Sequence, residues 1–188
     1  AIPTQFIRPV FSAIAPHLAD DVLIVSTAKG LEIDTGKRPS EILAESIKRP
    51  KIEEATISGP TIAAELIKRL PAVMLAASPN PARAVQVHDV FGTPWLRIYQ
   101  SDDLLGVELA GALKNVIALA AGMCDGLELG FNAKSALLAR GLAEMARFGV
   151  AMGAKKETFF GVAGVGDLAT TCFSPDGKTF YCTGRTSA

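Results

Sequence analysis

Residues 21–26 of the chain read DVLIVS, an apolar run bounded by Asp21 and Ser26. A strand that is buried on both faces has this continuous pattern, whereas a strand with one solvated face alternates apolar and polar residues. Strands buried in this way belong to parallel sheets that helices cover on both sides. The run therefore predicts an α/β fold, and the segments around it test that prediction.

Short apolar segments alternate with helical segments through the first hundred residues. Further strands are predicted at residues 55–58, 72–77 and 96–99, with the tail of an earlier strand at Ala1 and Ile2. Helices are predicted at residues 9–18, 39–49 and 81–91, and residues 59–70 are predicted to begin as a turn and become helical. Ser40 and Thr61 are candidate N-caps. Such alternation indicates parallel strands joined by right-handed crossovers. The expected fold class is α/β, with a partial doubly wound, Rossmann-like parallel sheet.

The pattern changes after Gln100. The predicted elements are a long helix at residues 102–123 capped by Ser101, a loop at 124–131, and a second long helix from Asn132 to about residue 153. Two long helices without a strand between them predict a separate all-helical domain. We therefore divide the chain into a partial Rossmann-like domain, residues 1–100, and a partial helical domain, residues 101–188.

The composition excludes several classes of protein. Nineteen basic residues balance nineteen acidic ones, so the net charge favours neither nucleic acid nor an anionic membrane as a partner. The three cysteines lack metal-ligand spacing and the two histidines lie far from any Ser or Asp constellation, so neither a metal site nor triad hydrolysis is expected. An odd number of cysteines without a disulfide pattern fits a reduced, cytoplasmic protein.

One apolar stretch, residues 104–124, approaches the length that spans a membrane. Because it contains Glu108, Lys114 and Asn115, we interpret it as a buried helix rather than a membrane span. Lys114 has only Ala110 and Gly111 at the preceding helical positions, which leave room beside its side chain. Its stem either reaches solvent or stays buried, and burial would lower its pKa and allow proton exchange near neutral pH. Asn115 could hydrogen-bond a substrate oxygen.

Three other features lie where α/β sheets bind ligands, beyond the carboxyl ends of strands. Lys29 closely follows the strand at 21–26 and is either a ligand contact or a solvated loop lysine. Residues 58–61 form a strand-to-helix turn, which either binds an anion or only caps the helix. Residues 164–169 match the pattern G-x-G-x-x-A, but a Ser-Pro-Asp-Gly break soon follows, so we reject a dinucleotide site there. Asp167 in this segment either caps a helix or orients a cationic lysine.

Seven segments occur together in one order. They are IPTQF at 2–6, KGLE at 29–32, ISGPTIAAE at 57–65, GVELAGALKNV at 106–116, CDG at 124–126, RGLAEM at 140–145 and GDLATTC at 166–172. In this order they resemble NAD(P)-dependent glycerol-3-phosphate dehydrogenase, closest to the bacterial form. The resemblance covers residues 1 to about 173, and its GALKNV portion is highly specific.

The resemblance implies a reaction and its catalytic residues. Dihydroxyacetone phosphate would be reduced by NAD(P)H to sn-glycerol 3-phosphate, which feeds phospholipid synthesis. Lys114 would be the general acid and base, Asp167 would position it, and Thr171 would support that network. A cation beside the carbonyl would also stabilise the developing oxyanion.

The resemblance also implies binding residues and partners. The implied substrate contacts are Lys29, Gly59, Thr61, Asn115 and Thr171, and the implied cofactor contacts are Phe6, Lys29 and Ala63. The cofactor would be NAD or NADP, bound by the domain at residues 1–100. A small phosphorylated substrate is the expected partner, and a homodimer is a candidate assembly.

The sequence departs from the family at both ends. The first strand with its G-x-G-x-x-G turn is absent, and residues 177–179 stand where the family has an Arg-Asn-Arg segment for the substrate phosphate. Lys178 offers charge there but not the bidentate geometry of arginine. Residues 180–188 do not resemble the family. We therefore expect the 188-residue chain alone to be a weak or inactive catalyst.

Three other functions stay open at this point. A hydroxyacid or ketopantoate-type dehydrogenase would share the architecture, although it is not expected to combine Lys29 with GALKNV, and a substrate panel would separate it. A non-catalytic fragment could associate with subunits through the edge of an incomplete sheet, and Lys114→Ala would leave that association intact. An anion-binding module would bind phosphate without any dependence on a nicotinamide cofactor.

Overall fold

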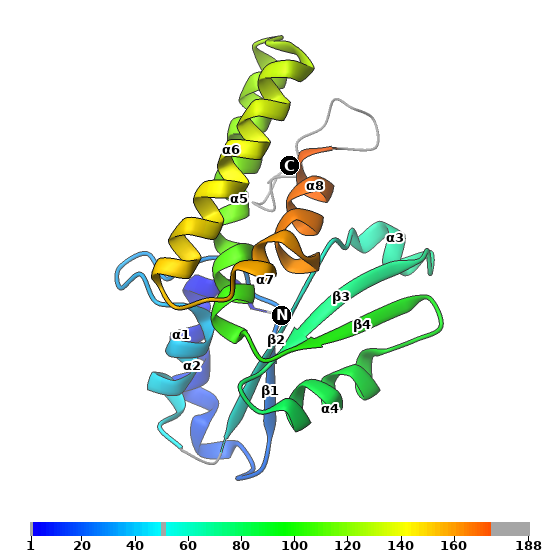
Figure 1. The fold of residues 1–188 in the computed structure, drawn as a ribbon. Helices are drawn as coiled ribbons and strands as arrows, with labels where there is room; N and C mark the ends of the chain where they lie inside the picture. Colours follow the sequence, from blue (N-terminus) through cyan, green and yellow to red (C-terminus); the bar gives the residue numbers. More distant parts are fainter. Residues whose placement is uncertain (1, 50–51, 174–188) are drawn as a thin grey trace, which may run out of the picture.

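The computed structural model describes residues 2–49 and 52–173, in which helices flank a four-stranded sheet (Figure 1). The strands are β1 (Leu23–Ser26), β2 (Glu53–Ser58), β3 (Ala72–Ala77) and β4 (Leu96–Ser101). The helices are α1 (Thr4–Ile14), the 3₁₀ turn η1 (Ala15–His17), α2 (Pro39–Ile47), α3 (Ala63–Ile67), α4 (Pro81–Phe91), α5 (Leu104–Gly126), α6 (Gly130–Ala151), α7 (Lys156–Phe160), the π turn η2 (Val162–Gly166) and α8 (Asp167–Cys172). The long helices α5 and α6 extend away from the sheet as an antiparallel pair (Figure 1).

The strands lie side by side in chain order, β1-β2-β3-β4. β1 and β2 are parallel and β3 and β4 are parallel, whereas β2 and β3 are antiparallel. The predicted α/β class is confirmed, but the prediction that all neighbouring strands run parallel is wrong at the central pair. A parallel pair needs a crossover of about a dozen residues or more, usually a helix along the sheet. Between Ser58 and Ala72 the chain forms only the five-residue helix α3, so it turns back instead of crossing.

Helix α1 begins at Thr4, before its predicted start at residue 9, and includes Pro9 in its interior. Proline cannot donate the helical hydrogen bond that its position requires. Bonds to the loop after β1 hold the first turn instead: Thr4 Oγ1 donates to the Lys29 carbonyl at 3.2 Å and Gln5 Nε2 donates to the Leu31 carbonyl at 2.8 Å. These long-range bonds explain why the helix extends ahead of the proline.

Helix α3 is shorter than the helical part predicted within residues 59–70, and Thr61 does not cap it. Ile62 occupies the N-cap position, and Thr61 Oγ1 instead donates to the Gly59 carbonyl at 3.4 Å. The helix ends before Arg69, whose φ of 56° is left-handed. A five-residue helix has a weak dipole, which reduces the case for an anion site at its N-terminus.

Both long helices differ from prediction at their ends. Asp103, not Ser101, caps α5, since its Oδ1 accepts from the Gly106 amide at 2.9 Å, while Ser101 is the last residue of β4. Helix α5 also continues to Gly126, so the predicted loop at 124–131 is mostly helical. Helix α6 follows Leu129, which places Asn132 inside its first turn rather than at its cap.

Helix α5 is the central element of the helical half. It packs against α6, α7, α8 and η2 and against the strands β2 and β3. Its length and hydropathy would suffice to cross a membrane, yet 56% of its most apolar stretch is buried inside the fold. Its buried Glu108 and Lys114 form ion pairs with other elements. It is therefore a core helix, as the sequence predicts.

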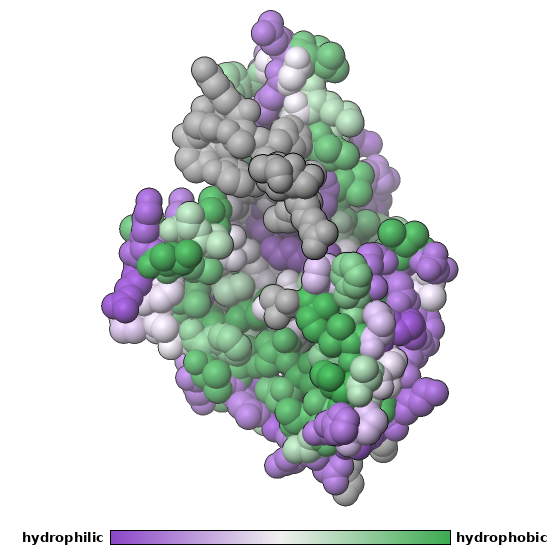
Figure 2. Space-filling model, turned by 180° about the vertical axis from the view of Figure 1, so that it is seen from behind, coloured by the Kyte–Doolittle hydropathy of each residue, from purple (hydrophilic) through white to green (hydrophobic). Residues whose placement is uncertain are grey.

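The sheet is incompletely covered. All four residues of β1 and the first four of β3 are only half-buried. Seen from behind, hydrophobic residues gather over the lower half of the molecule (Figure 2). On monomeric proteins a large contiguous apolar area is uncommon and marks a surface that another segment or molecule covers.

Gly59 provides a test of how tightly β2 meets β3. Its φ is +156°, and a Cβ there would lie 2.8 Å from the Val73 carbonyl oxygen and 2.9 Å from Met74 Cα. We expect Gly59→Ala to lower the free energy of unfolding by about 2 kcal/mol, because backbone atoms cannot rotate out of the way. Urea denaturation measures the loss. The control is Gly126→Ala, where a Cβ meets nothing within 4 Å, and equal losses in both variants would contradict this account.

Candidate active site

Three segments that are far apart in the sequence meet at one carboxylate. Lys29 lies in the loop after β1, Lys114 lies midway along α5, and Asp167 is the first residue of α8. Lys29 Nζ is 2.6 Å from Asp167 Oδ2, and Lys114 Nζ is 3.3 Å from Asp167 Oδ1. The fold thus brings together the two lysines and the aspartate that the sequence singled out.

Thr171 completes the contacts of Lys114. Lys114 Nζ donates to Thr171 Oγ1 at 2.6 Å, and Thr171 Oγ1 donates to the Asp167 carbonyl at 2.7 Å. The four-residue spacing on α8 places the aspartate and the threonine on one helix face. Since the hydroxyl proton is committed to the carbonyl, a lone pair of Thr171 faces the lysine and fixes the position of its ammonium.

Burial dominates the electrostatics of Lys114. Its side chain is only 4% exposed, and the loss of solvation lowers its pKa below the ordinary lysine value. The Asp167 carboxylate opposes this change, whereas the Lys29 ammonium lowers the pKa of Lys114 further. With both lysines protonated, two positive charges face one negative charge. The site therefore favours an anion or an oxygen that gains negative charge.

Gly111 and Ser58 lie beside the stem of Lys29. A Cβ on Gly111 would be 3.4 Å from Lys29 Cγ, so the bare backbone of α5 lets the lysine lie closely against it. Ser58, the last residue of β2, is 3% exposed, and its Oγ has no hydrogen-bond partner among the residues that the structure describes. An unpaired buried hydroxyl is costly, so Ser58 is a polar group that the described residues leave unsatisfied beside Lys29.

The turn at residues 58–61 borders the segment that carries Asp167. A Cβ on Gly59 would be 3.2 Å from a Val162 methyl group, and one on Gly166 would be 3.7 Å from Pro60. Thr61 is half-buried in this turn. Asn115, which follows Lys114 on α5, is also half-buried.

The two predicted cofactor contacts outside the lysine cluster are exposed. Phe6 is 58% exposed in α1, and Ala63 is the exposed first residue of α3. The bond between Thr4 and the Lys29 carbonyl brings the start of α1 to the lysine loop. Lys178 and the divergent tail at 174–188 lie outside the described residues, so the expectations about them stay predictions.

Sequence patterns did not predict the buried ion pair between Glu108 and Arg38. Arg38 Nη1 is 2.7 Å from Glu108 Oε2, and the Glu108 side chain is only 1% exposed. Burial raises the pKa of Glu108, while hydrogen bonds from Ser40 and the charge of Arg38 lower it. The signal that could have revealed this pair is the one that singled out Lys114, a charged residue within an apolar helix.

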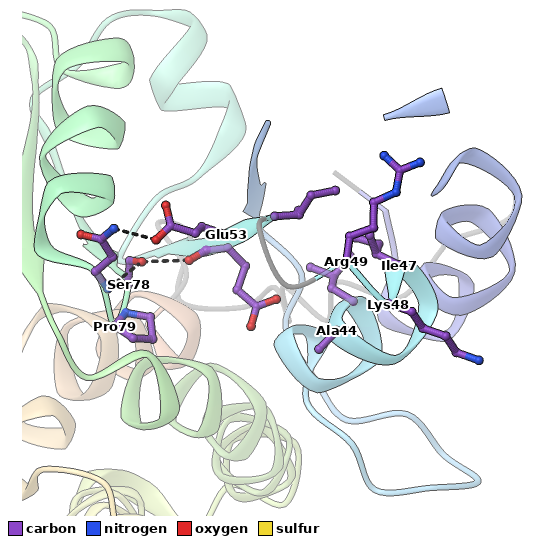
Figure 3. Close-up of a pocket in the computed structure, with 11 residues that line it drawn as sticks. Ala44, Ile47, Lys48, Arg49, Glu53, Ser78 and Pro79 are labelled. Carbon is purple, nitrogen blue, oxygen red and sulfur yellow. Dashed lines mark hydrogen bonds between the residues drawn. The ribbon is translucent and has the colours of Figure 1, made fainter. Parts of the chain in front are cut away.

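A separate pocket of about 470 Å³ lies at the opposite end of β2 (Figure 3). Glu53, Glu54 and Ser78 line it together with apolar residues of α2. Burial raises the pKa of Glu54 to about 7. Ser78 Oγ donates to the Glu54 carbonyl at 2.9 Å, which ties β3 to β2 (Figure 3). The lysine cluster rather than this pocket is the candidate site, because it brings two cations, a carboxylate and a hydroxyl together from distant segments of the chain.

A Rossmann-like sheet joined to a helical part, with buried lysine and carboxylate groups at the junction, is the arrangement of the two-domain α/β dehydrogenase class. The comparison with known families is more specific. The model of the NAD-dependent glycerol-3-phosphate dehydrogenase N-terminus matches residues 1–84, and the model of its C-terminus matches residues 103–186. The chain belongs to this family, and the resemblance seen in the sequence is confirmed.

Individual proteins that resemble the chain belong to the same family. The chain is 48% identical over 171 residues to the glycerol-3-phosphate dehydrogenase [NAD(P)+] of Syntrophotalea carbinolica, covering 90% of the chain and 51% of that protein. It is 49% identical over 175 residues to that of Lysinibacillus sphaericus, covering 93% and 52%. The crystal structure of glycerol-3-phosphate dehydrogenase from Coxiella burnetii superimposes with a TM-score of 0.87 at 35% identity, covering 94% of the chain and 53% of that structure. The chain thus spans about half the length of the curated relatives it matches.

The shared carboxylate yields a stability prediction. We expect Asp167→Asn to lower the free energy of unfolding at pH 7 by about 3 kcal/mol, because it leaves a buried ammonium without its counter-charge. Thermal or urea denaturation measures the change. The matched control is Asp20→Asn, since Asp20 pairs with Arg49 but is 84% exposed and should contribute less than about 1 kcal/mol. A loss at Asp167 no larger than at Asp20 would refute the description of this site.

Proposed function

We propose that the protein interconverts dihydroxyacetone phosphate and sn-glycerol 3-phosphate with NAD or NADP. The observation that carries this proposal is the pair of lysines on one buried carboxylate, which gives the site excess positive charge and a proton donor shielded from water. The names of the relatives, glycerol-3-phosphate dehydrogenase [NAD(P)+], support the same reaction. The product would feed phospholipid synthesis.

The residues present fit the nicotinamide end of such a cofactor. Phe6 offers an exposed aromatic ring, and Ala63 offers a small side chain that leaves room beside the turn after β2. Lys29 lies between them in chain order, at the carboxyl end of β1, where α/β sheets bind nucleotides. When bound, the cofactor supplies a hydride to the carbonyl carbon of the substrate.

Lys114 holds and moves the proton. An ammonium has three N–H donors, and two of those on Lys114 already face Asp167 and Thr171. The third is free in this scheme for the carbonyl oxygen of the substrate. As the carbon receives hydride, the proton passes from Lys114 Nζ to that oxygen, the hydroxyl forms and the lysine becomes neutral. Asp167 and Thr171 hold Nζ in place throughout.

The neighbouring groups bind the substrate in this proposal. Lys29 contributes the second positive charge, which stabilises the phosphorylated substrate and the negative charge that grows on its oxygen. Asn115 offers an amide from the adjacent position of α5. Gly59, Thr61 and Thr171 border the same space from the turn after β2 and from α8.

We also propose the organisation of the protein. A boundary near residue 100 is supported by the change from β4 to α5 between Ser101 and Leu104. A cytoplasmic location is supported by the cysteine pattern. A homodimer is supported by exposed apolar side chains along one side of α5, such as Val116, Leu119 and Met123.

The function is tested by oxidation of NADH and NADPH with a panel of carbonyl substrates. We expect selectivity for dihydroxyacetone phosphate over 2-keto acids and ketopantoate in protein made from the coding sequence that contains this chain. We expect weaker turnover from the 188-residue chain. Lys114→Met should lower kcat by about 100-fold or more, whereas Lys68→Met, which removes an exposed lysine on another element, should not. Unselective turnover, or phosphate binding without any cofactor-dependent reaction, would contradict the proposal.

The lowered pKa of Lys114 predicts a pH profile. Reduction requires the protonated lysine, so kcat should fall as the pH rises through a pKa that lies below the ordinary value of 10.5. Asp167→Asn removes a charge that raises this pKa, so the fall should move to lower pH. The test is to measure kcat of the wild type and of Asp167→Asn across the alkaline pH range. A fall that stays in place or moves to higher pH in the variant would show that Lys114 is not the acid.

A further inference from the structure

Glu108 joins helix α5 to the start of α2. Its Oε1 accepts from the Ser40 amide at 2.8 Å, and its Oε2 accepts from Ser40 Oγ at 2.6 Å and from Arg38 Nη1 at 2.7 Å. Ser40 lies in the first turn of α2, whose amides have no partner within the helix. The carboxylate of Glu108 therefore caps a helix that belongs to a different part of the chain, where negative charge is favourable.

Arg38 ends the loop that carries Lys29. This loop closes on itself, because the Glu32 amide donates to the Lys37 carbonyl at 2.9 Å. This bond holds Glu32, three positions after Lys29, beside the end of the loop at Lys37. Few covalent and hydrogen bonds therefore connect Arg38 with Lys29. A displacement of Arg38 would therefore reach Lys29 through few bonds.

One face of α5 contacts both ends of this loop. Glu108 holds Arg38 at one end, and Gly111, three positions further along the helix, lies against Lys29 at the other. Lys114 follows after another three positions. On the outer side, α1 fixes the loop through Arg8, which pairs with Glu32 at 2.7 Å. Glu108, Gly111 and Lys114 thus follow one another at three-residue intervals along α5. They contact Arg38, contact Lys29 and supply the second lysine, in that order.

A stability argument alone does not account for the buried pair. Replacing a buried ion pair by well-packed apolar residues is often neutral or stabilising, because both charges lose their hydration. We propose that Glu108 is a positioning residue: by holding Arg38 and the start of α2 on α5, it sets where the loop presents Lys29 to Asp167. Its consequence for turnover rests on the function proposed above, whereas its effect on Lys29 does not.

The test measures the chemical reactivity of Lys29 directly. Lys29 is 29% exposed and paired with Asp167, so trinitrobenzenesulfonate labelling followed by peptide mass spectrometry reports whether that pair is intact. We expect Glu108→Gln, which removes the charge and keeps the size, to raise Lys29 labelling about three- to tenfold. In protein that turns over dihydroxyacetone phosphate, KM should rise about tenfold with a smaller change in kcat. The alkaline limb should move to higher pH, because the displaced Lys29 ammonium no longer lowers the pKa of Lys114.

The matched control is Asp103→Asn. Asp103 is another buried carboxylate, which caps α5 through the Gly106 amide. Its other partners, Lys155 and Thr158, lie away from the lysine loop. It should destabilise the fold without raising Lys29 labelling. If both variants raise the labelling equally, the effect is general loosening and the proposal is overturned.

A milder variant keeps the test decisive if Glu108→Gln does not fold. Ser40→Ala removes one hydrogen bond to Glu108 and leaves the Arg38 pair, so a rise in Lys29 labelling of about twofold supports the proposal and no rise overturns it. If wild-type protein fails to reduce dihydroxyacetone phosphate while Glu108→Gln still exposes Lys29, the proposed function fails and the positioning role stands.

Discussion

Asp167 is the single negative charge on which two lysines converge, and the rest of the site follows from that imbalance. A carboxylate paired with one ammonium would give a neutral, closed ion pair. Shared between Lys29 and Lys114, it holds both groups in place and leaves positive charge for a third participant. Thr171 matters for the same reason, because its lone pair steadies Lys114 without neutralising it.

Small residues make the convergence physically feasible. Lys29 lies closely against α5 at Gly111, where even a Cβ would be in van der Waals contact with its stem. Gly59 likewise lets the end of β2 meet β3 and η2 closely, so that the turn after β2 lies beside the segment that carries Asp167. Helix α5 thus has two roles. Its buried apolar side chains pack in the core, and its buried Glu108 and Lys114 form ion pairs with other elements.

Much of this could be predicted from local pattern, and the failures have a common cause. Lys29 and Lys114 stood out because one follows a strand and the other interrupts an apolar helix, and both properties are local. The early start of α1 and the pair of Glu108 with Arg38 depend on partners distant in sequence. The antiparallel pairing of β2 and β3 depends on a helix that stays too short to cross the sheet. Propensity and periodicity contain no information about such partners.

The separation of 138 positions between Lys29 and Asp167 has a consequence for synthesis. On the ribosome, the sheet and α5 emerge well before α8. Until α8 is available, docking α5 onto the sheet would bury Lys114 without its counter-charge, which is strongly unfavourable for an ammonium. The nascent chain is therefore biased to keep this apolar helix undocked, and within reach of chaperones, until the residue that completes the site has been translated.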